Sequence, residues 1–177
     1  MIRPLFEEPS PAIERSSPWA GPKGFLIGGM ALPIKEELSL QYFDAANLLL
    51  KAIHNDEMED YRLVNPVLFL YRHSIELMLK SFVDSTGHDL AALADKFAAV
   101  VKQRFGEEPP AWIMVRLKEI AQIDPNSTAF RYSENYNRQL KQHVPVDGEL
   151  YISLSHLREV METLNAGLVS VWRSRTS

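Results

Sequence analysis

Four polar residues in a predicted, otherwise apolar helix are the clearest candidates for chemistry in this chain. We call them the polar ladder: Arg72, His73, Glu76 and Lys80. At about 100° per residue, all four follow one edge of a helix, within an arc of about 100°. A guanidinium or ammonium group can hold a phosphate, and an imidazole exchanges a proton near neutral pH. The spacing therefore gathers groups suited to phosphate and proton chemistry on one edge.

Three interpretations of the polar ladder are open from the sequence. As a solvated edge, it would form exposed ion pairs worth roughly a few tenths of a kcal/mol each. As a covered structural network, it would lie beneath the loop of residues 124–151, because the apolar Phe69 and Val83 fall inside the same arc. In that arrangement we expect Arg131, which belongs to the loop, to pair with Glu76.

The third interpretation is a ligand or active site. Arg72, His73 and Lys80 would then surround a phosphate of a small nucleotide. Arg131 would approach from the loop, and the turn after the helix would bring His88 near. No metal or cofactor is expected, since the acidic segment 54–60 has neither EF-hand nor HExxH spacing.

Composition narrows the class of protein. The 177 residues are 46% hydrophobic and 24% charged, which is typical of a globular domain. A net charge of −4 argues against tight binding to duplex DNA, and the absence of cysteine excludes disulfides and thiol nucleophiles. No apolar run reaches the roughly 18 residues that a transmembrane helix needs. We therefore expect a soluble, cytoplasmic protein without membrane contact.

Apolar periodicity predicts an all-α bundle of four to five helices in residues 34–177. The predicted helices cover residues 34–53 and 65–85, then run between Asp89 and Gly106, from Pro110 to Asp124, and onward from Ser153. Asn65 is expected to cap the second helix, with Pro66 at its first position. The loop before the last helix holds two β-favouring pieces, 129–132 and 149–152, which we expect to pair as a small hairpin.

Residues 1–33 differ from the rest of the chain. They hold six of the eleven prolines and four of the eight glycines, so no continuous helix can form there. Their apolar side chains are more numerous than a solvated tail would carry. We predict an extended N-terminal arm, residues 1–33, that docks on its own bundle or on a partner protein.

Three segments follow one another in a recognisable order: the Arg-His-x-x-Glu-Leu-x-x-Lys pattern of residues 72–80, Gly87-His88-Asp89-Leu90, and Phe130-Arg131-Tyr132. Together they resemble a group of uncharacterised bacterial and phage-associated proteins akin to the HEPN superfamily. The resemblance covers about residues 38–172. It implies a helical bundle, commonly dimeric, and in many members a metal-independent endoribonuclease of toxin–antitoxin or antiphage systems.

The resemblance also implies a catalytic pair. HEPN nucleases use an Arg, four to six residues and then a His near the start of a late helix, and the two copies meet across the dimer. Arg138-Gln-Leu-Lys-Gln-His143 matches this spacing, with Arg138 to neutralise the scissile phosphate and His143 as general acid or base. Pro145 and Gly148 follow, so the match lies in the long loop instead of on a helix, and a chance match is the alternative.

Two functions follow from these observations. The first is an RNA-cleaving effector of a defence or toxin module, independent of metal and acting as a homodimer. The second is a non-catalytic HEPN-like interaction module that binds a partner protein through the N-terminal arm, or binds a nucleotide.

Overall fold

The computed structural model describes residues 33–125, 127–132, 135–137, 141–144 and 150–174. The chain divides into two units, Met1–Pro33 and Ile34–Ser177. The predicted N-terminal arm therefore lies outside the described residues, apart from Pro33, and the description below concerns the second unit.

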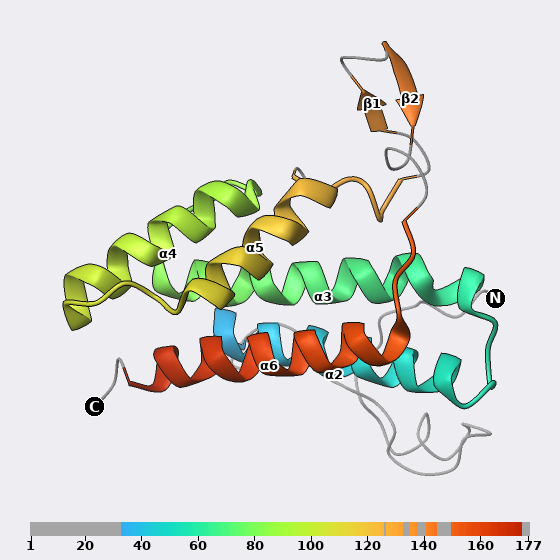
Figure 1. Ribbon diagram of the computed structural model, residues 1–177, viewed down its shortest axis with the longest axis horizontal. Helices are drawn as coiled ribbons and strands as arrows, with labels where there is room; N and C mark the ends of the chain where they lie inside the picture. Colours follow the sequence, from blue (N-terminus) through green and yellow to red (C-terminus); the bar gives the residue numbers. More distant parts are fainter. Residues whose placement is uncertain (1–32, 126, 133–134, 138–140, 145–149, 175–177) are drawn as a thin grey trace, which may run out of the picture. The chain divides into compact units, whose positions relative to one another are not determined.

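The second unit is all-α, as the sequence predicts. Its described part holds five helices: α2 Lys35–His54, α3 Asp60–Phe82, α4 Leu90–Phe105, α5 Ala111–Ile123 and α6 Leu154–Arg173. In Figure 1, α3 runs through the middle, with α4 and α5 on one side and α2 and α6 on the other. None of the described helices has the length and apolar character needed to cross a membrane.

Helix α3 is the centre of the core because it packs against α2, α4 and α6. Its contact with α2 is the most extensive, and two small residues let the two helices approach closely. The hydroxyl of Ser39 donates to the carbonyl of Ser74 at 2.8 Å, and both residues are buried. Around this contact α3 buries a wide apolar surface, formed by Val67, Tyr71, Ile75, Met78 and Leu79.

The predicted start of α3 was wrong. The helix begins at Asp60, after Glu59, so Asn65 and Pro66 lie inside it. Packing explains the extension, since Leu63 lies one turn before the buried Val67 and packs against the core. Pro66 lies on the exposed side of the helix, where the one backbone hydrogen bond that it removes faces water. The helix also ends earlier than expected, at Phe82.

The other predicted helix boundaries agree with the structure. The side chain of Asp89 accepts a hydrogen bond from the Ala92 N–H at 3.0 Å and caps α4. Gly106 ends that helix in the left-handed conformation, at φ 76°, which favours glycine. Pro110 precedes α5, and Ser153 caps α6 through the His156 N–H.

A small hairpin exists in the loop, but the predicted strands were wrong. The paired strands are β1 Asn135–Asn137 and β2 Gln142–Val144, which run antiparallel with Tyr136 opposite His143. Residues 129–132 form turns instead, because the N–H groups of Arg131 and Tyr132 donate to the Thr128 carbonyl. Residues 150–152 form no strand.

The observed start of α3 predicts opposite effects for two alanine substitutions. Inside a helix, Asn65→Ala should raise the free energy of unfolding by up to about 0.7 kcal/mol, because alanine has the higher helix propensity. Asp89→Ala, which removes a true cap, should lower it by about 1 kcal/mol. Urea denaturation measures both, and a loss of about 1 kcal/mol in Asn65→Ala would instead identify Asn65 as the cap.

Candidate functional site

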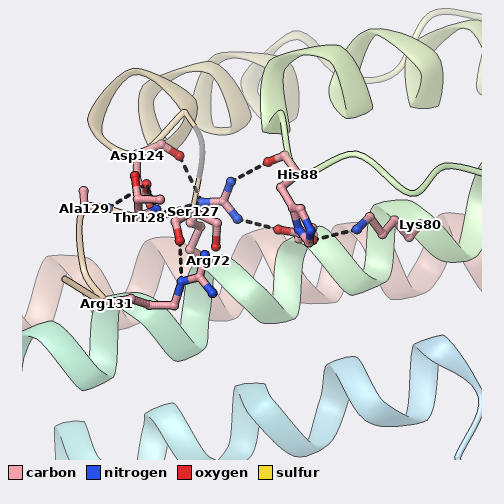
Figure 2. A network of polar contacts seen from close by, with 9 residues as sticks. Arg72, Lys80, His88, Asp124, Ser127, Thr128, Ala129 and Arg131 are labelled. Carbon is pink, nitrogen blue, oxygen red and sulfur yellow. Dashed lines mark hydrogen bonds and ion pairs between the residues drawn. The ribbon is translucent and has the colours of Figure 1, made fainter. Parts of the chain in front are cut away.

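Arg72 of α3 lies at the centre of a buried polar network (Figure 2). Its side chain is 1% exposed, and every nitrogen of the guanidinium donates a hydrogen bond. Nη1 donates to Glu76 Oε2 at 2.6 Å, Nη2 to the His88 carbonyl at 2.7 Å, and Nε to the Asp124 carbonyl at 3.0 Å. One side chain therefore joins α3, the connection between α3 and α4, and the end of α5.

Glu76 supplies the negative charge at the centre of this network. Its Oε1 accepts hydrogen bonds from Lys80 Nζ and from His88 Nδ1, each at 2.7 Å. Burial alone would raise the pKa of the Glu76 carboxyl, but hydrogen bonds from Lys80, Arg72 and His88 hold this pKa below its ordinary value. Glu76 is therefore ionised at neutral pH, although its side chain is 1% exposed.

Asp124, the residue that follows α5, covers the network. Its Oδ1 accepts the backbone N–H groups of Thr128 at 2.7 Å and Ala129 at 3.0 Å. Its Oδ2 lies 3.1 Å from Arg72 Nε, whose single hydrogen is directed to the Asp124 carbonyl. This second oxygen accepts no hydrogen bond among the described residues, so its contact with Arg72 is electrostatic. We call Arg72, Glu76, Asp124, Lys80 and His88 the buried polar network.

Burial excludes one of the three interpretations of the polar ladder. The side chains of Arg72 and Glu76 are each 1% exposed, so the interpretation as a solvated edge was wrong for them. Lys80 is also largely covered, at 11% exposed, and its ammonium is directed at Glu76. The described contacts thus direct the charges of Arg72 and Lys80 at carboxylates and backbone carbonyls of the protein, not at a bound phosphate.

The expected pair between Arg131 and Glu76 was wrong. Nε of Arg131 donates to the Ser127 carbonyl, and the guanidinium carbon lies 5.8 Å from the ring centroid of Phe69. The turn that Asp124 organises at residues 127–132 brings the Ser127 carbonyl to Arg131, which bonds there instead of to Glu76 (Figure 2). Lys80 and His88 donate hydrogen bonds to Glu76 where Arg131 was expected to do so.

His73 belongs to an aromatic cluster and not to the network. Its ring stacks on Phe69, with centroids 5.6 Å apart and an interplanar angle of 11°. It also makes an edge contact with Tyr42 at 4.6 Å. Burial lowers the pKa of the His73 imidazole, so the ring is neutral at pH 7.

His88 is the network residue that faces solvent. Its side chain is 61% exposed, and Nδ1 lies 2.7 Å from the buried Glu76 carboxylate. A carboxylate at Nδ1 favours the tautomer with the proton on that nitrogen, which leaves Nε2 as a proton acceptor. The backbone carbonyl of His88 is fixed as well, by Arg72. An exposed imidazole that is oriented by a carboxylate at Nδ1, on a backbone fixed by Arg72, is suited to proton transfer.

The structure does not test whether Arg138 and His143 form a pair. Arg138 lies outside the described residues. His143 lies in β2, where only its backbone is described, so this residue is in a strand of the hairpin and not at the start of a helix. Their catalytic role stays a prediction.

Sequence reasoning missed Asp124 as a member of the site. Asp124 was predicted only as the end of a helix. The run of polar residues from Asp124 to Thr128 could have indicated its role. An aspartate at the start of a turn commonly accepts hydrogen bonds from the backbone N–H groups of that turn.

Comparison with protein-family models finds no match for this chain, and comparisons with curated proteins and with solved structures find none either. Within the described residues, no group of three or more His, Asp or Glu side chains is placed to hold a metal ion. The HEPN resemblance therefore rests on the motifs quoted from the sequence.

The first test of the buried polar network removes its arginine. Arg72→Met should lower the free energy of unfolding by about 3–5 kcal/mol, because it leaves the buried Asp124 carboxylate without its cation and removes one of the cations that hold Glu76. Arg116→Met is the matched control, since Arg116 forms a pair with Glu119 at 2.6 Å on the surface. That control should cost less than about 1 kcal/mol. Equal losses in the two variants, measured by urea denaturation, would contradict a structural role for Arg72.

The lowered pKa of Glu76 predicts a pH dependence of stability. A carboxyl whose pKa is lower in the folded state stabilises the protein above its unfolded pKa, about 4.5, and this contribution is lost as pH falls through the folded pKa. The free energy of unfolding of Glu76→Gln should therefore fall less than that of the wild type on acidification below about pH 4.5. Parallel pH profiles from urea denaturation would contradict this.

Proposed function

We propose that this protein is a HEPN-like, metal-independent endoribonuclease of a bacterial defence or toxin–antitoxin module, which acts as a homodimer in the cytoplasm. The motifs of residues 72–80, 87–90 and 130–132 support the family. The observation that carries the chemistry is the exposed His88 imidazole, which is oriented by the buried carboxylate of Glu76.

The proposed reaction is transesterification within the RNA strand. Nε2 of His88 takes the proton of a ribose 2′-OH, and the resulting oxygen attacks the adjacent phosphorus. The bond from phosphorus to the 5′-oxygen of the next nucleotide breaks, and this oxygen leaves with a proton. The products are a 2′,3′-cyclic phosphate and a 5′-hydroxyl. Glu76 stabilises the imidazolium that forms on His88, as the carboxylate of a catalytic triad does.

The buried polar network keeps this arrangement ready before substrate binds. Arg72 and Lys80 hold the Glu76 carboxylate ionised and fixed, at 2.6 Å and 2.7 Å. A preorganised charge does not need to be reoriented during the reaction, which is the usual source of electrostatic catalysis. In this proposal Arg138 and His143, the pair implied by the resemblance, act on the phosphate and on the leaving oxygen.

The proposal predicts cleavage of RNA in the presence of EDTA. Purified wild-type protein should release fragments that end in a 2′,3′-cyclic phosphate. His88→Ala should reduce the rate at least about a hundredfold, the contribution expected of a general base. The backbone bond to Arg72 remains in this variant, so the fold should persist.

Two further variants make the assay selective. His143→Ala tests the pair implied by the resemblance, and His54→Ala, at the exposed end of α2, is the control that should cleave at the wild-type rate. Absence of cleavage by the wild type would contradict the proposed function. Unchanged cleavage by His88→Ala would contradict the role of His88 alone.

A second function is favoured by the burial of Arg72 and Glu76. Because these residues are structural, the polar ladder does not by itself require an active site, and a non-catalytic interaction module is the alternative. That module would bind its partner protein through the N-terminal arm, and deletion of residues 1–30 would then abolish partner binding while the helices stay folded. The EDTA cleavage assay separates the two functions.

A further inference from the structure

A continuous set of planar side chains connects α2, α3 and the loop after α5. We call it the aromatic–arginine patch, and it consists of Tyr42, His73, Phe69, Arg131 and Tyr132. Tyr42 contacts His73, and His73 stacks on Phe69. The guanidinium carbon of Arg131 lies 5.8 Å from the Phe69 centroid and 5.3 Å from the Tyr132 centroid.

The outer part of the aromatic–arginine patch is open to solvent. Tyr132 is 58% exposed. Arg131 is also exposed, and the one described hydrogen bond of its side chain is to the Ser127 carbonyl. Among the described residues no carboxylate pairs with Arg131, so its positive charge is available to an anion from outside.

We propose that the aromatic–arginine patch binds an unstacked base of single-stranded RNA, with the adjoining phosphate on Arg131. A tyrosine ring and a guanidinium plane both accept the face of any nucleobase, and the remaining N–H groups of the guanidinium match a phosphate. Bases in a duplex are already stacked on one another and cannot use such a surface. This inference rests on the proposed function and specifies its substrate as single-stranded.

The position of the patch fits a substrate that also reaches His88. Phe69 and Glu76 are seven residues apart on the same edge of α3, which is about 10 Å along the helix axis. Figure 2 shows Arg131 and His88 on either side of Arg72. A strand held on the patch would therefore need to extend only a short distance to place a ribose at His88.

Binding of an uncleavable RNA tests the patch separately from catalysis. The probe is a short, fluorescein-labelled single-stranded RNA in which every 2′-OH is methylated, and the readout is fluorescence anisotropy on the full-length protein. Tyr132→Ala should weaken binding about five- to 150-fold, the range for loss of one stacked base. Arg131→Gln should also weaken it and should reduce the dependence of binding on salt.

Two matched controls define the background. Tyr61→Ala removes a tyrosine that is 73% exposed near the start of α3, and Arg116→Gln removes an exposed arginine of α5. Both should bind the probe as the wild type does. A duplex RNA of the same length should bind at least about tenfold more weakly than the single strand.

The outcomes distinguish failure of the patch from failure of the proposed function. Wild-type binding in Tyr132→Ala and Arg131→Gln, or equal binding of duplex and single strand, overturns the inference even if the protein cleaves RNA. Absence of probe binding by the wild type overturns it as well. Binding that depends on Tyr132 and Arg131 supports the patch, even where unmethylated RNA stays uncut, and in that case the proposed function fails alone.

Discussion

The charge of Arg72 has to be neutralised inside the protein, and the second unit is arranged around this requirement. A buried guanidinium is tolerated only when its donors and its charge are matched. The three matching acceptors come from Glu76, from the backbone of the α3–α4 connection, and from Asp124. Segments that are 52 residues apart in the chain are thereby fixed to one point on α3. The apolar core stabilises the helices, whereas this network determines where their connections must lie.

The sequence was sufficient for the parts of the fold that depend on local signals. Asp89, Gly106 and Ser153 act within one turn of their helices, so their effects can be read from neighbouring residues. The start of α3 could not be read this way. Asn65 and Pro66 give a strong local signal, but packing of the preceding turn against the core extends the helix past them.

The candidate site was predictable in most of its members and not in its contacts. The polar ladder and His88 were visible from spacing, because a helix fixes the relative positions of residues three and four apart. Which partner approaches Glu76 depends on the turn at residues 127–132, and no helical period describes a turn. For this reason Arg131 was expected at Glu76, although Lys80 and His88 are there, and Asp124 was overlooked.

The two carboxylate oxygens of Asp124 contact different parts of the fold, and Asp124 thereby connects these parts. One oxygen holds the backbone of the turn that carries Arg131, while the other faces Arg72, which in turn holds Glu76 and the backbone of His88. A ligand that displaced this turn would move the carboxylate that faces Arg72 and, through Arg72, would act on the backbone of His88; such an effect is reciprocal by thermodynamic linkage. One carboxylate therefore connects the exposed turn that carries Arg131 with the segment that carries His88, on the other side of Arg72.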